Sequence, residues 1–268
     1  MGAAGRHAIK TAPEHATWAE FLAFWQEADQ VEVFESAWNW DHFYPLTPPY
    51  DGPNLEGWTM LAALAQATTR LRLGAMVNGM HHRHPAVTAN MAATLDHISG
   101  GRFELGIGAG WNEMETNAYG LELGSLTDRF DRLDEGLEII RSLLDNKETT
   151  FSGRFFQITG AWCEPKPVQA KLPIVLGGKG PKRALRAAAR WADQWDMTMP
   201  ANPDEWLALD AALREHCATF GRDPDEITRS IHLRFASEDD PAALADRAAG
   251  FFEAGVDVRL ATSVWGLY

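Results

Sequence analysis

The sequence is poor in the features that mark secreted, membrane-spanning or disulfide-rich proteins. It contains two cysteines, Cys163 and Cys217, whose separation matches neither a disulfide framework nor a metal-ligand spacing. No apolar run approaches the roughly 18 residues of a membrane span, and residues 1–10 lack the apolar core of a signal peptide. We therefore expect a cytoplasmic protein with no membrane partner.

Basic residues are also scarce relative to acidic ones. The chain has 24 Lys and Arg against 37 Asp and Glu, which gives a formal charge of −13 at pH 7. A nucleic-acid-binding surface needs a basic footprint, so we expect no nucleic-acid partner. An anionic ligand would have to be met by a local cluster of positive charge.

The residues that are present fit one large α/β domain. A hydrophobic content of 46% with a charged content of 23% is ordinary for a soluble globular protein. The length of 268 residues suits an α/β barrel, which needs about 250 residues. No repeat of fixed period and no long linker divides the chain, so we expect residues 1–268 to form a single domain.

Short apolar segments alternate with helix-compatible stretches along the chain. This alternation is typical of parallel strands joined by helical crossovers, and eight such strands favour a closed (β/α)8 TIM barrel. Residues 263–268 are too few for the helix that usually closes the barrel. The groove between the first and seventh helices should therefore be bare or covered by a partner chain, and we expect a homo-oligomer. The predicted strands span 7–10, 33–40, 71–78, 103–107, 174–176, 194–198, 228–235 and 256–262.

The stretch Asp96–Glu115 organises this pattern as helix, turn, buried strand, glycine loop and helix. Because Gly106, Gly108 and Gly110 carry no Cβ, a flat or phosphorylated ligand could lie directly on their backbone. A plain tight turn is the alternative interpretation. A dinucleotide fingerprint is disfavoured, because it requires G-x-G-x-x-G in the first βα unit.

A histidine follows the second predicted strand, at the barrel edge where active sites lie. His42 stands beside Asp41 and several aromatic residues, and an imidazole there can donate or accept a proton near neutral pH. The alternative is a structural histidine bonded within the barrel rim. Aromatic residues that could line an apolar substrate wall are Trp38, Trp40, Phe43, Tyr44 and Trp111.

A second glycine-rich loop follows the fifth predicted strand. Its glycines open the backbone, and its proline suits the first position of a helix, where free N–H groups and the helix dipole favour an anion. Lys182 and Arg183 add positive charge in an otherwise acidic chain. We therefore predict a phosphate or other anion here, the alternative being a basic helix start. The loop consists of Gly177, Gly178, Lys179, Gly180 and Pro181.

Three segments carry a resemblance to a known family. They are SGGRFELGIGAGWNEME, which ends at Glu115, the triplet Asp41-His42-Phe43, and GGKGPKR after Leu176. Together they resemble the bacterial luciferase-like flavin and deazaflavin oxidoreductases, in family order and over most of the chain. The branch that they resemble most uses the deazaflavin coenzyme F420.

The resemblance implies a role for each of these segments. Asp41 would contact the deazaflavin head, and His42 would face the reacting ring and the substrate. A non-prolyl cis peptide bond would lie near the end of the third strand, where the backbone presses against the ring. The acidic side chain of the cofactor would be held by the loop that begins at Gly177. The further cofactor contacts that the family pattern implies are Met76, Val77, Asn78, Gly79, Ile107, Gly108 and Asn112. In contrast, we expect Glu113 and Glu115 to lie on a solvated helix face.

The function implied by the resemblance is hydride transfer between F420 and a small organic substrate. An FMN-dependent luciferase-like monooxygenase is the first alternative, and a non-catalytic barrel that binds flavin or deazaflavin is the second. A metal site is disfavoured, because His81, His82 and His84 follow the third predicted strand and later strand ends lack matching ligands. Arg83 and His84 are instead interpreted as the start of a helix, and we expect no metal.

Overall fold

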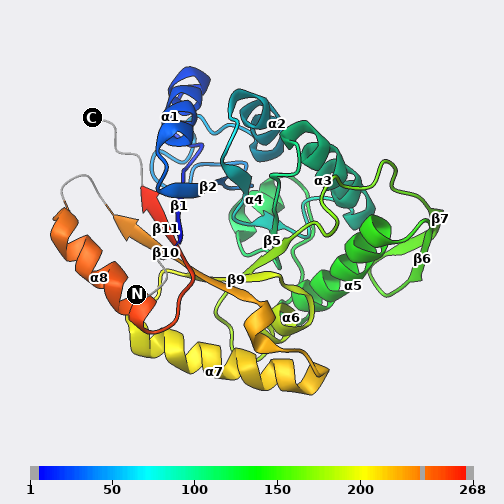
Figure 1. Cartoon of the computed structure of the whole chain (residues 1–268). Helices are drawn as coiled ribbons and strands as arrows, with labels where there is room; N and C mark the ends of the chain where they lie inside the picture. The colour runs from blue at the N-terminus through cyan, green and yellow to red at the C-terminus, as the bar shows by residue number, and fades with distance from the viewer. Residues whose placement is uncertain (1–5, 236–238, 264–268) are drawn as a thin grey trace.

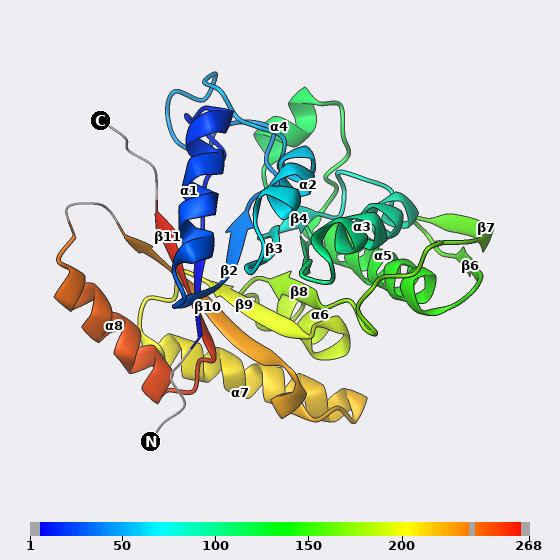
Figure 2. The same cartoon turned by 45° about the horizontal axis from the view of Figure 1, so that its top comes forward.

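A computed structural model describes residues 6–235 and 239–263. Parallel strands form a cylinder, and helices surround it (Figure 1 and Figure 2). Neighbouring strands follow the order β3-β2-β1-β11-β10-β9-β8-β5-β4. Their bounds are Arg6–Lys10 (β1), Phe34–Asn39 (β2), Arg72–Ala75 (β3), Asn78–Gly79 (β4), Leu105–Gly108 (β5), Ile174–Gly177 (β8), Gln194–Thr198 (β9), Thr228–Phe235 (β10) and Val258–Ser263 (β11).

The cylinder closes because β3 and β4 are two pieces of one interrupted strand. The first piece pairs with β2, and the second pairs with β5. A parallel bridge between Leu73 and Phe103 completes the contact. The two pieces are separated by Met76 and Val77, which are joined by the non-prolyl cis peptide bond that the family resemblance implies. The predicted barrel fold is therefore confirmed.

Helices cover the outside of the cylinder. Their bounds are Trp18–Gln30 (α1), Gly57–Ala67 (α2), Pro85–Ser99 (α3), Glu113–Ala118 (α4), Leu126–Asp145 (α5), Ala184–Trp191 (α6), Pro203–Phe220 (α7) and Pro241–Glu253 (α8), with a 3-10 turn at Pro224–Glu226 (η1). Side-chain caps fix several helix starts, because the first backbone amides of a helix have no partner within it. Thr17 and Ser125 each form a reciprocal capping box, with Glu20 and Asp128 respectively.

The barrel interior and the layer between strands and helices form separate cores. Ala8, Trp38, Met76 and Val175 pack with Val258 inside the cylinder. Trp38 is fully buried there, so it is a core residue and does not form part of a substrate wall. Interior strands also approach closely: a Cβ on Gly106 would lie 1.9 Å from the Ala75 carbonyl oxygen. Glycine is therefore required at that position.

Two peripheral regions complete the description. A hairpin outside the barrel is formed by the antiparallel strands β6 (Thr149–Ser152) and β7 (Gln157–Ala161). The described residues end with β11, so the predicted lack of a closing helix lies outside them. The two elements that flank β11 on the outside are α1 and α8 (Figure 1). A homo-oligomer that covers this side stays a prediction. Across residues 6–235 and 239–263, none of the helices combines the length and apolarity needed to cross a bilayer.

Candidate active site

The carboxyl ends of the barrel strands open into a cavity of about 970 Å³. This is the end of a TIM barrel where active sites are built. The cavity brings together twelve of the fourteen residues predicted to bind cofactor or carry catalysis. They are Asp41, His42, Met76, Val77, Asn78, Gly79, Gly108, Gly177, Gly178, Lys179, Gly180 and Pro181. We call the face that these residues form the glycine wall.

The other two predicted residues, Ile107 and Asn112, do not line the cavity. Side chains alternate between the two faces of a strand, and Ile107 points outward into the core between strands and helices. Asn112 is the N-cap of α4, and its side chain accepts a hydrogen bond from the Glu115 amide at 3.4 Å. Both side chains are thus used within the protein.

His42 is held in place by a buried carboxylate. Its Nδ1 lies 2.5 Å from Glu115 Oε1, and the Phe43 amide donates to Glu115 Oε2 at 2.9 Å. Glu115 is 1% exposed, so the expectation that it faces solvent was wrong. The reason is that α4 is a short helix packed over the strand ends with Glu115 and Thr116 turned inward. The Asn112-to-Glu115 spacing of an N-capped turn was the only sequence signal for this arrangement.

The charge on Glu115 follows from its partners. Burial alone would raise the pKa of the carboxyl group, but the hydrogen bond and charge of His42, with the Phe43 amide, bring its pKa below the usual value. The carboxylate therefore accepts from the His42 Nδ1–H group, which leaves Nε2 as the nitrogen free to meet a ligand. Trp40 and Trp111 contact the imidazole edge to face, at centroid distances of 5.8 and 5.5 Å. Both indoles line the cavity.

Asp41 lies in a second network on the same wall. Arg83 Nη1 donates to Asp41 Oδ2 at 2.6 Å, and His82 Nδ1 lies 3.1 Å from the same oxygen. Burial would raise the pKa of Asp41, but His82 and Arg83 together hold it below its ordinary value. Arg83 also donates to Glu56 at 2.8 Å. Arg83 therefore does more than lead into α3, which was its predicted role.

The histidines after β4 have protein partners. His81 Nε2 lies 3.0 Å from the Thr116 hydroxyl, and His84 caps α3 by accepting from the Ala86 amide. Burial, followed by the charges of His82 and Arg132, lowers the pKa of His81 to about 3, so this ring is uncharged at neutral pH. Within the described residues no three His, Cys, Asp or Glu side chains gather in a way that could hold a metal ion.

The second glycine-rich loop lines the cavity, but its geometry differs from the prediction. Helix α6 begins at Ala184, and Pro181 lies in a preceding turn. The helix N-terminus is thus displaced from the proline, because Pro181 and the two residues after it form a turn. Gly178 has φ +132°, a conformation that favours glycine. The Gly178 amide donates to the Asp196 carbonyl at 3.1 Å, and the Gly178 carbonyl accepts from Trp195 Nε1 at 2.8 Å.

Unpaired polar atoms are concentrated around the cavity. Nine buried side-chain nitrogen or oxygen atoms in the described residues lack a hydrogen-bond partner, and five of them belong to residues that line it. Leaving such a group unpaired costs about 1–3 kcal/mol, so a polar ligand that pairs with them would be stabilised. The five are Asp41 Oδ1, Asn78 Oδ1, His81 Nδ1, His82 Nε2 and Arg129 Nε.

The side of the cavity built by β1, β9 and β10 has a different composition. It carries four charged or titratable residues, Lys10, Asp196, His232 and Arg234, which we call the strand wall. His232 Nδ1 lies 2.8 Å from Asp196 Oδ2, and the Ser230 hydroxyl donates to Asp196 Oδ1 at 2.9 Å. None of these residues was among the predicted site residues. The sequence signal that could have identified them is a charged or polar residue within an otherwise apolar predicted strand.

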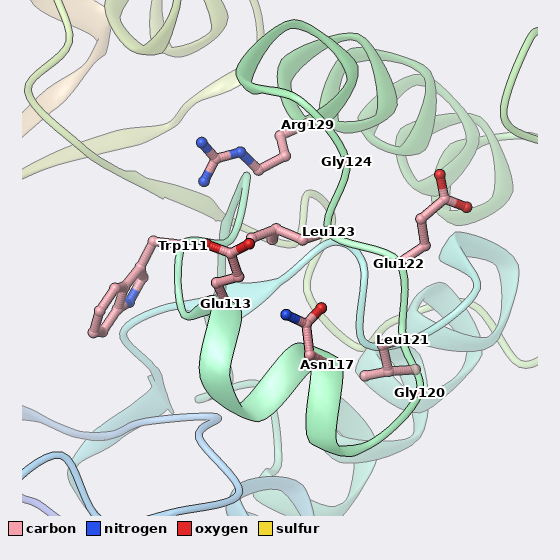
Figure 3. Close-up of a pocket in the computed structure, with 9 residues that line it drawn as sticks. All are labelled: Trp111, Glu113, Asn117, Gly120, Leu121, Glu122, Leu123, Gly124 and Arg129. Atoms are coloured by element: carbon pink, nitrogen blue, oxygen red, sulfur yellow. The ribbon is translucent and has the colours of Figure 1, made fainter.

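A smaller pocket of about 520 Å³ adjoins the cavity between α4 and the start of α5. Trp111 and Arg129 line both spaces. Figure 3 shows these two side chains toward one end of the pocket and Asn117 and Leu121 toward the other. Glu113, which is exposed as expected, lies between them.

Comparison with known proteins identifies relatives of the chain. A family model described as luciferase-like monooxygenase matches residues 3–263. An uncharacterized protein of Mycobacterium tuberculosis is 33% identical over 219 residues, which cover 73% of this chain and 75% of that protein. The phthiodiolone/phenolphthiodiolone dimycocerosates ketoreductase of the same species is 36% identical over 215 residues. That match covers 72% of this chain but 55% of the ketoreductase.

Solved structures share the barrel. An F420-dependent secondary alcohol dehydrogenase, in complex with an F420-acetone adduct, matches with a TM-score of 0.86 and 20% identity, over 97% of this chain and 93% of that one. The F420-dependent tetrahydromethanopterin reductase of Methanopyrus kandleri gives 0.80 and 19%, with the same coverage. A monooxygenase of Streptomyces bottropensis gives 0.76 and 22%, over 97% and 92%. At these identities the likeness establishes a common fold.

Proposed function

The chain belongs to the luciferase-like monooxygenase family, and we propose that it is an oxidoreductase that uses coenzyme F420. The reaction would transfer a hydride between the deazaflavin and a small carbonyl or alcohol substrate. The observation that carries this proposal is the His42–Glu115 pair, which presents one free imidazole nitrogen to a cavity with a glycine-lined wall. Two of the structural neighbours are F420-dependent enzymes, and one curated relative is a ketoreductase.

The residues of the glycine wall fit such a cofactor. Glycine at Gly79, Gly108 and Gly177 lets His81 and Val77 pack closely against the strand ends that line the cavity. The unpaired Asn78 and Asp41 oxygens offer hydrogen-bond acceptors. The loop from Gly177 to Pro181, with Lys182 beside it, would hold the acidic side chain. When bound, F420 would supply the centre that gives or takes the hydride.

His42 would handle the proton that accompanies the hydride. The Glu115 carboxylate fixes the ring with Nδ1–H as donor, so Nε2 faces the substrate oxygen. In carbonyl reduction, Nε2–H donates its proton to the oxygen as the carbon gains a hydride. In alcohol oxidation, Nε2 accepts the hydroxyl proton. Trp40 and Trp111, packed on the imidazole, limit water access to this nitrogen.

The first experiment asks which cofactor binds. The chain has 11 tryptophans, and Trp40 and Trp111 line the cavity, so titration with F420 or FMN should quench tryptophan fluorescence. We expect F420 to bind at least about tenfold more tightly than FMN, a difference of about 1.4 kcal/mol. Tighter FMN binding with oxygen-dependent turnover would overturn the proposal in favour of a monooxygenase.

The second experiment tests His42. His42→Ala should lower the rate of hydride transfer about 100- to 10,000-fold, with the F420 dissociation constant changed by less than about threefold. The control is His97→Ala, an exposed position on α3 whose ring contacts a backbone carbonyl outside the cavity. Full turnover by His42→Ala would eliminate the proton role. F420 binding with no turnover of any carbonyl or alcohol would favour a non-catalytic barrel.

A further inference from the structure

Lys10 and Arg234 lie at the same height on the strand wall. Both pair with Thr262 in the strand register, Lys10 from β1 and Arg234 from β10, with β11 between them. Paired residues in a parallel sheet point to the same face, and neighbouring strands lie about 4.8 Å apart. The two side chains therefore enter the cavity from positions roughly 10 Å apart, and both line it.

Among the residues that the structure describes, neither Lys10 nor Arg234 has a hydrogen bond or an ion pair within 4 Å. The Asp196 carboxylate acts on Lys10 through its charge, which raises the pKa of the ammonium group. Its two oxygens, however, already form hydrogen bonds with Ser230 and His232. Burial, opposed in part by Asp196, lowers the pKa of Lys10. An ammonium held in such a place is stabilised by an anion that reaches it.

His232 adds a third polar atom at this place. The side chain is 3% exposed, and its Nδ1 is bound to Asp196, so Nε2 is the nitrogen left toward the cavity. Burial and then the Lys10 charge lower the pKa of His232, although Asp196 opposes them, so the ring is uncharged at neutral pH. A neutral ring leaves Lys10, Arg234 and Asp196 with a net charge of +1.

The whole cavity is positive within an acidic protein. Six Lys and Arg residues line it against four Asp and Glu residues, although the chain carries a net charge of −13. The cations form separate groups. Lys179, Lys182 and Arg183 belong to the loop at the end of β8, whereas Arg234 and Lys10 lie on the strand wall, on strands two and four places away from β8 in the barrel order. In the first group Lys179 also pairs with Glu205 and Arg183 with Asp131. These acids and one acidic cofactor side chain account for the first group and leave the second without a role.

We propose that Lys10 and Arg234 bind a carboxylate of the substrate, so that the enzyme acts on oxo or hydroxy carboxylic acids. This inference rests on the proposed function for the reaction but concerns a separate group of residues. A carboxylate fits better than a phosphate monoester, because the net charge of +1 matches a monoanion and the described residues on the strand wall include no glycine-amide loop. His232 Nε2 would accept a hydrogen bond from a neighbouring hydroxyl of the same substrate.

The test measures binding without cofactor. Levulinate, its neutral methyl ester and butyl phosphate are titrated into the full chain, and their dissociation constants are measured by saturation-transfer NMR. We expect levulinate to bind at least about tenfold more tightly than methyl levulinate. Equal binding of acid and ester would overturn the proposal, and tighter binding of butyl phosphate would reassign the site to phosphorylated substrates.

Variants locate the effect. Lys10→Met and Arg234→Gln should each weaken levulinate binding about tenfold and leave methyl levulinate unchanged. Lys182→Met, on the opposite side, is the matched control and should leave levulinate binding unchanged. Arg234 is exposed, so its replacement keeps the test valid if Lys10→Met fails to fold. Unchanged levulinate binding in a folded Arg234→Gln chain would contradict the assignment.

The same variants separate this proposal from the proposed function. F420 binding is measured in each, and Lys10→Met and Arg234→Gln should keep it. If the wild-type chain binds levulinate through these residues but does not bind F420, the proposed function fails and the carboxylate site stands. If the chain binds F420 but binds levulinate and methyl levulinate equally well, the carboxylate site fails and the proposed function stands.

Discussion

The two walls of the cavity are built by different means. The glycine wall relies on backbone, with loops and strand ends that leave space for a ligand, and its Asp41 and His42 side chains are held by Arg83 and Glu115. The strand wall relies on single side chains that extend from β1, β9 and β10, and its two cations have no hydrogen-bond or ion-pair partner in the described part of the chain. Backbone contacts suit a ligand that is the same in related proteins, such as a cofactor. Side-chain contacts can be altered by single substitutions, so they suit a substrate that differs from one protein to another.

The largest expected effect lies behind the glycine wall, at Glu115, which holds His42. In Glu115→Gln the amide NH2 group would face either the Phe43 N–H or the His42 Nδ1–H, two donors that a carboxylate satisfies together. We expect kcat to fall about 10- to 1,000-fold while the F420 dissociation constant stays within about twofold. Steady-state kinetics with a fluorescence titration check both values. Glu113→Gln, an exposed neighbour on the same helix, should behave as wild type; a similar loss there would remove the special role of Glu115.

The next largest effect is expected at Gly178, where a pair of glycine variants separates the cost of backbone strain from the loss of cofactor contact. Gly178→Val places a branched side chain at φ +132°, with its Cβ 3.3 Å from Ala184 Cβ. We expect a loss of stability of about 1–3 kcal/mol and at least about tenfold weaker F420 binding. Gly221→Val, at φ +63° with open space, carries comparable strain away from the cavity. It should lower the melting temperature without changing F420 affinity. Equal loss of affinity in both variants would show that the backbone of the loop does not contact the cofactor.

The pH dependence of unfolding tests how much the paired charge of Asp41 contributes to stability. The folded pKa of Asp41 lies below its ordinary value, so this group contributes stability that is present above the unfolded pKa of about 3.9 and is lost as pH falls through the folded pKa. Asp41→Asn should therefore lower the free energy of unfolding by about 1–3 kcal/mol at pH 7. This difference in unfolding free energy between the variant and the wild type should shrink as pH falls below about 4. Urea unfolding at several pH values measures this. Asp51→Asn, in an exposed loop, should show no such dependence.

The smallest effect is expected on the strand wall. Ser230→Ala removes one hydrogen bond from Asp196 and keeps its bond to His232. We expect a loss of about 1 kcal/mol in the free energy of unfolding, measured by urea denaturation, with F420 affinity unchanged. A large loss of F420 affinity in this variant would mean that the two walls do not act separately.

The difference between the walls also explains what the sequence could predict. The barrel and most of the glycine wall were predicted, because glycine loops and strand-end motifs are local signals that keep their spacing. Glu115 was placed wrongly, since the inward face of a six-residue helix depends on packing and not on periodicity. The strand wall was missed because Lys10, Asp196 and His232 are distant in sequence and meet only when the cylinder closes. Likewise, α6 begins after Arg183 because a turn, which proline equally permits, occupies residues 181–183.

Asp196 belongs to both halves of the cavity, through different atoms. Its main-chain carbonyl receives the Gly178 amide, and its carboxylate holds His232 and Ser230. Because the loop is fastened to an atom that every amino acid possesses, the side chain at this position can be replaced during evolution without releasing the loop. New substrate preferences could therefore arise at the end of β9 in a protein that keeps its cofactor.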